Sequence, residues 1–168
     1  MLAATFYRDW GTFGQVVGGA SGALVGLLFV AVALNRARII QHVVLRASAL
    51  QTLLVLMLPL LVAILLTIPR QSSMVLGWEF IALGLLEATG DVITGRWRRT
   101  HVGSLPTGKI WLVSYVSPNL LTAFLTITAG ALFTARINDS VYLVVPIVLL
   151  ALVGGATNAW LFLMTDIE

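Results

Sequence analysis

Five long runs of apolar residues, separated by short gaps that hold most of the charges, make up nearly the whole chain. Each run is long enough to cross a bilayer core of about 30 Å as a helix, which needs about 20 residues. The runs lack the alternation of polar and apolar residues that membrane β-strands show. The pattern predicts an all-α, polytopic integral membrane protein whose residues 1–168 form a single transmembrane domain of five transmembrane helices. The predicted spans are residues 13–34, 44–68, 74–94, 110–134 and 141–164.

Composition supports a membrane location. Hydrophobic residues form 59% of the chain and charged residues only 10%, whereas soluble domains carry roughly 25% charged residues. We therefore expect the lipid bilayer to be the main partner of the outer surface. Cysteine is absent, which excludes disulfides and thiolate metal sites. The pI near 10.0 comes from few charges without an extended basic face, so nucleic acid is not an expected partner.

Basic residues are distributed unequally between the two sets of gaps, and this asymmetry predicts orientation. One side carries seven of them: Arg36, Arg38, Arg46, Arg96, Arg98, Arg99 and Lys109. The other side carries three: Arg8, Arg70 and Arg136. Because short cytoplasmic loops are enriched in Lys and Arg, we expect the N-terminus outside and the C-terminus in the cytoplasm. Nine arginines to one lysine suggest a GC-rich bacterial genome, and hence a multi-pass protein of the bacterial inner (cell) membrane.

Small residues form a stripe along the first predicted span. Gly14, Gly18, Gly22 and Gly26 follow one another at four-residue spacing, so they share one helix face. Such a face lets another helix approach closely in lipid. The contacting helix could belong to the same chain or to a second copy, or the stripe could line a pore. We expect a helix-packing role and a homo-oligomer, with other membrane subunits as possible partners.

Two carboxylates lie deep in the third predicted span. Glu87 is about 12 Å from the predicted cytoplasmic end, at 1.5 Å per residue, and Asp91 follows one turn later. Acids within a span are costly and mark functional sites by default. Residues four apart on a helix are neighbours, so two charges here would repel unless a proton, a cation or a basic side chain intervenes.

Other spans place amides and hydroxyls at a similar depth. The candidate ion- or proton-binding residues are Glu87, Asp91, Asn119, Asn158, Ser117, Thr122 and Thr157. Oxygen ligands of this kind suit protons and hard cations. The alternative is an interhelical hydrogen-bond network that only fixes packing. For Asp91, a salt bridge to Arg46, Arg98 or Lys109 is a further alternative.

Signals for cofactors and enzymatic chemistry are lacking in the sequence. His42 and His101 fall in predicted gaps, so neither haem nor another metal site is expected, and we expect no cofactor. The HExxH, GxSxG and P-loop motifs are absent, so we expect no catalytic residues and no enzyme. A membrane-embedded enzyme that uses Glu87 or Asp91 on lipid is a remaining possibility.

The sequence therefore predicts a small oligomeric membrane channel or carrier for cations or protons, with its carboxylate site in the third span. A bundle of five helices is too small for a wide lumen, so a continuous path would need several subunits. The alternative is a non-catalytic structural or assembly subunit of a larger membrane complex. That alternative explains the glycine stripe and the lack of a soluble domain equally well.

Overall fold

The computed structural model describes residues 2–101 and 117–164, and these residues form helices and short turns without β-strands. The prediction of an all-helical fold is confirmed for these residues. The described residues contain six α-helices and one 3₁₀ helix. They are α1 (Leu2–Leu34), α2 (Arg36–Gln41), α3 (Val43–Thr67), α4 (Ser73–His101), α6 (Ser117–Thr134), the 3₁₀ helix η2 (Asn138–Leu143) and α7 (Val144–Met164).

Four of these helices are long and apolar enough to cross a membrane. The qualifying segments are Trp10–Leu34, Leu45–Thr67, Ser73–Arg96 and Asp139–Trp160. A shorter apolar helix, Asn119–Thr134, corresponds to the fourth predicted span. The first part of that span and Lys109 lie outside the described residues.

Two helices extend well beyond the ends of the predicted spans. α1 begins at Leu2, before the apolar run, and α4 continues to His101, beyond the predicted end at residue 94. Both extensions contain charged residues. Hydropathy marks only the apolar part of a helix, whereas the backbone hydrogen bonds continue into polar sequence.

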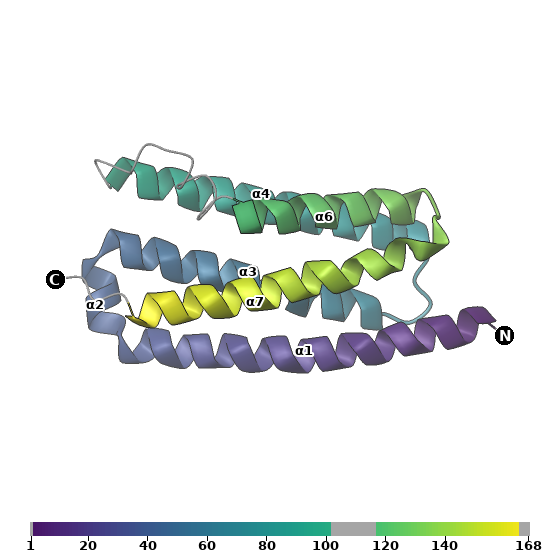
Figure 1. Cartoon of the computed structure of the whole chain (residues 1–168), viewed down its shortest axis with the longest axis horizontal. Helices are drawn as coiled ribbons and strands as arrows, with labels where there is room; N and C mark the ends of the chain where they lie inside the picture. The colour runs from purple at the N-terminus through teal and green to yellow at the C-terminus, as the bar shows by residue number, and fades with distance from the viewer. Residues whose placement is uncertain (1, 102–116, 165–168) are drawn as a thin grey trace.

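The long helices lie side by side along one common direction (Figure 1). α3 packs against α1, α7 and α4, while α4 packs most extensively against α6. Short turns connect α3 to α4 and α6 to α7 at one end of the bundle, and α2 connects α1 to α3 at the other end (Figure 1). The main core lies between these helices, where the buried rings of Phe80 and Phe133 meet edge-to-face with centroids 5.2 Å apart.

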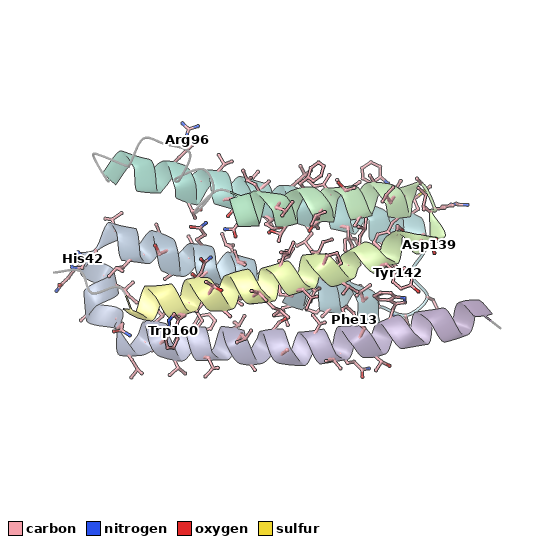
Figure 2. All side chains as sticks on the ribbon, viewed as in Figure 1. Phe13, His42, Arg96, Asp139, Tyr142 and Trp160 are labelled. Carbon is pink, nitrogen blue, oxygen red and sulfur yellow. The ribbon has the colours of Figure 1, made fainter. Side chains whose placement is uncertain are left out.

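Charged and aromatic side chains mark the two ends of the bundle. Figure 2 shows His42, Arg96 and Trp160 toward one end, and Asp139 and Tyr142 toward the other. Trp10 joins α1 to η2 at that second end, because its ring meets Tyr142 edge-to-face with centroids 5.6 Å apart. The basic residues assigned to the cytoplasmic side by sequence thus include two, Arg36 in α2 and Arg96 in α4, that lie at the same end.

Candidate functional site

The buried face of α4 combines glycines and polar residues with the ring of Phe80, at alternating spacings of three and four. Its members are Gly77, Phe80, Gly84, Glu87 and Thr94, with Asp91 half-buried. The opposite face is apolar and exposed, and it includes Trp78, Leu85, Leu86, Val92 and Ile93. The carboxylates of α4 therefore point toward neighbouring helices, and its large hydrocarbon side chains point outward.

Glycines bring α4 and α6 into backbone contact. A Cβ atom on Gly130 would lie 2.6 Å from the backbone oxygen of Gly77, and a Cβ on Gly84 would lie 3.0 Å from that of Ala123. Real Cβ atoms do not tolerate the shorter of these distances, so a side chain at Gly130 would push the helices apart. This interface was not predicted from the sequence. The seven-residue spacing between Gly77 and Gly84 places both glycines on one helix face, and it is the pattern that indicates the contact.

The same interface brings together the acids and the polar residues of α6. Thr122 Oγ1 donates a hydrogen bond to Glu87 Oε1. One turn along both helices, Asn119 Nδ2 donates to Asp91 Oδ1 over 3.3 Å. Asn119 and Thr122 are both buried, and Thr122 Oγ1 also lies 2.7 Å from the backbone oxygen of Asn119. Four of the predicted site residues thus form one hydrogen-bonded cluster, which we call the α4–α6 carboxylate cluster: Glu87, Asp91, Asn119 and Thr122.

Among the described residues, each carboxylate of this cluster keeps one oxygen without a hydrogen-bond partner. These atoms are Glu87 Oε2 and Asp91 Oδ2, and both are buried. Only 9% of the Glu87 side chain is exposed. A buried polar atom left unpaired costs free energy, more so when it is charged, so an acid kept in this state suggests a function beyond packing.

Two of the remaining predicted site residues lie on α7, and their described side chains make no hydrogen bond to the cluster. Thr157 is exposed on α7, and its hydroxyl donates to the backbone oxygen of Val153 over 2.7 Å. Asn158 is half-buried on the same helix. The side chain of Ser117 lies outside the described side chains. Within the described chain, the hydrogen bonds to the two acids come from α6, and none comes from α7.

The glycine stripe of α1 divides into a covered half and an open half. A Cβ on Gly14 would lie 3.0 Å from the backbone oxygen of Ala63 in α3, and one on Gly18 would lie 3.4 Å from the Cβ of Ala63. Added Cβ atoms on Gly22 and Gly26 would meet nothing within 4 Å. The first half of the stripe therefore contacts α3, and the second half faces outward.

A third acid of α4 lies away from the cluster. Glu79, two turns before Glu87, accepts a hydrogen bond from Gln71 Nε2 in the turn between α3 and α4. The first turns of α4, which carry Glu79, lie at the same end of the bundle as Asp139. The turn thus supplies Glu79 with a polar partner, which separates its role from that of Glu87.

No group of three or more His, Cys, Asp or Glu residues comes together in residues 2–101 and 117–164. The chain matches no family model, no curated protein and no solved structure. The chemistry open to the cluster is the binding of a proton or a cation by the free carboxylate oxygens.

Proposed function

We propose that the chain is an integral membrane protein with five spans, its N-terminus outside and its C-terminus in the cytoplasm of a bacterial cell. The supporting observation is the distribution of side chains over the bundle. Large hydrocarbon side chains are exposed on every long helix, such as Leu27, Ile64, Leu86, Phe124 and Val153. Some polar side chains, such as Thr52, Glu87 and Thr126, are buried together with the hydrophobic core. Soluble proteins rarely expose apolar surface on this scale, whereas a bilayer requires it.

Within that setting, the chain acts as a small oligomeric channel or carrier for protons or cations, and Glu87 is its binding carboxylate. The observation that carries this proposal is the buried, unpaired Glu87 Oε2 beside the unpaired Asp91 Oδ2. A purely structural network would be expected to pair these oxygens with donors, since leaving them unpaired is costly. A transport site needs such atoms, because the bound ion must be able to arrive and leave.

Flux through purified protein in liposomes tests this function. Wild type should carry protons, sodium or potassium down an imposed gradient. Glu87→Gln keeps the shape of the side chain and removes its charge, so it should lower flux about tenfold or more. The measurement is the initial rate of dye-reported proton flux, or of tracer-reported cation flux, at equal protein incorporation.

Glu79→Gln is the matched control, because it makes the same substitution on the same helix two turns away. This variant should retain wild-type flux. Absence of any flux through wild type would reject the transport function, and equal flux through Glu87→Gln would reject Glu87 as its site.

The alternative function is a non-catalytic subunit of a larger membrane complex. The open glycines Gly22 and Gly26 support it equally well, since a helix face without side chains suits a contact with a different chain as much as with a copy. Purification in mild detergent separates the two functions. A transporter should run as a stable homo-oligomer, and a subunit should run as a monomer or with foreign partners.

A further inference from the structure

We propose that the ligand of the α4–α6 carboxylate cluster is a proton and not a metal cation, with the Thr122 hydroxyl as the group that adapts to both protonation states of Glu87. This inference rests on the proposed function for its membrane setting and its site. It narrows the ligand from protons or cations to protons alone.

The Thr122 hydroxyl lies between two hydrogen-bond acceptors. Its Oγ1 is within hydrogen-bonding reach of two acceptors, Glu87 Oε1 and the backbone oxygen of Asn119, the latter at 2.7 Å. A hydroxyl carries a single hydrogen and accepts through its lone pairs. With Glu87 ionised, Thr122 donates to the carboxylate. With Glu87 protonated, the carboxyl O–H donates to Thr122 Oγ1, and Thr122 donates to Asn119.

Rotation of one hydroxyl therefore accommodates the gain or loss of a proton without moving a heavy atom. The reaction is the transfer of one proton to or from a carboxylate oxygen, with no other bond made or broken. Thr126 shows the contrast, since its hydroxyl is 2.8 Å from the backbone oxygen of Thr122 and has no acid beside it.

α6 presents hydrogen-bond donors to the two acids. Asn119 presents its Nδ2, a donor, to Asp91, and Thr122 presents a hydroxyl hydrogen to Glu87. Both groups face the acids with hydrogens in this arrangement, and a hydrogen cannot coordinate a metal ion. Two free oxygens remain, Glu87 Oε2 and Asp91 Oδ2, whereas Ca²⁺ takes about 6–8 oxygen ligands and Mg²⁺ about six. A proton needs only one.

Few charged residues of the described helices lie near the level of Glu87. The described parts of α6 and α7 contain no charged residue, and α3 contains Arg46 alone. Gly90 of α4 faces Leu54 of α3, and Arg46 lies eight residues before Leu54, about 12 Å along the helix. On α4 itself, Asp91 is one turn away from Glu87, and Glu79 and Arg96 are two turns or more away; the side chains of Arg98 and Arg99 lie outside the described side chains. Among the described residues, no basic residue lies level with Glu87 along these helices, and we assign its charge balance to a proton.

Infrared difference spectroscopy of the full chain in lipid nanodiscs tests the inference without requiring transport. Between mildly acidic and mildly alkaline buffer, wild type should show a carbonyl-stretch band of a protonated carboxyl that disappears in Glu87→Gln. Thr122→Val keeps the side-chain shape and removes the acceptor, so the Glu87 band should move to higher frequency. Thr122→Ser should restore the wild-type frequency, and the matched control Thr126→Val should leave it unchanged.

Three results would overturn the inference: no carboxyl band assignable to Glu87, a band that responds to sodium or potassium at constant pH, or an unshifted band in Thr122→Val. Flux measurements keep the two proposals distinguishable. Flux with a cation-sensitive band rejects the proton and retains transport. A proton-dependent Glu87 band without flux supports the proton as ligand and rejects transport.

Discussion

At the scale of single residues, two arginines adopt backbone angles that side chains usually avoid. Arg70 has φ 57° and Arg136 has φ 59°. Arg136 lies just after the C-terminus of α6. Its N–H donates to the backbone oxygen of Phe133 over 3.0 Å, and the N–H of Ile137 donates to the backbone oxygen of Leu132 over 3.1 Å. This is the pattern of a helix C-terminus that glycine commonly closes, and for an L-residue the left-handed region costs about 1–2 kcal/mol.

Replacing Arg136 should therefore reveal the strain. Arg136→Gly and Arg136→Ala both remove the side chain, but only glycine relaxes the backbone. We expect the glycine variant to be more stable than the alanine variant by about 1 kcal/mol. Thermal unfolding in detergent checks this, and equal unfolding temperatures of the two variants would contradict it.

The acids illustrate how far single residues were predictable. Glu87 and Asp91 were singled out because carboxylates within an apolar run are costly wherever they face. Depth along the spans predicts Asn119 and Thr122 as site residues, and the structure brings both to the acids. Depth predicts Thr157 as well, but its side chain is exposed. Depth along a helix does not determine the direction in which a side chain points.

At the scale of elements, the α4–α6 pair is the part of the bundle that carries the site. Its glycines allow the close approach of the two backbones, and one or two turns along the same interface the acids meet Asn119 and Thr122. The distance between the helices therefore controls the hydrogen bonds to Glu87 and Asp91. Disturbing the glycines should disturb the site.

Gly130→Ala tests this coupling. The added methyl would lie 2.6 Å from the backbone oxygen of Gly77, so the helices must separate, and overpacking of this kind costs about 1–3 kcal/mol. We expect a lower unfolding temperature in detergent. Gly95→Ala is the control, because its Cβ meets nothing within 4 Å and alanine favours the helix by up to about 1 kcal/mol. Equal destabilisation of both variants would contradict close packing between α4 and α6.

At the scale of the whole molecule, the described connections lie at the two ends of the bundle, with α2 at one end and the α3–α4 and α6–α7 connections at the other (Figure 1). Gln41 of α2 lies at the end near His42, and Ser72 lies in the turn between α3 and α4 at the opposite end; both are exposed. The seven-to-three distribution of basic residues predicts that the Gln41 end lies in the cytoplasm.

Single cysteines check this orientation directly, since the chain has none of its own. In intact cells, Ser72→Cys should react with an impermeant maleimide, and Gln41→Cys should react only after the membrane is opened. The reverse labelling would show that the orientation is inverted, and labelling of both in intact cells would show that the two ends do not lie on opposite sides of a membrane.

The sequence by itself determined the properties that depend on one segment at a time. The length and apolarity of each run predict helices that can cross a bilayer, because lipid offers the backbone no hydrogen-bond partner. The position of Glu87 within such a run marks a costly group, and four-residue glycine spacing marks a face that permits close approach. Each of these properties follows from one-dimensional spacing.

Only the tertiary structure decided which faces meet. It brought the small residues of α4 onto α6, divided the α1 stripe between α3 and an open surface, and left Glu87 Oε2 and Asp91 Oδ2 without donors. These outcomes depend on the rotation of each helix about its axis and on the register between two helices. Many combinations of rotation and register bury similar apolar area, so the choice among them follows from the packing of all the helices together.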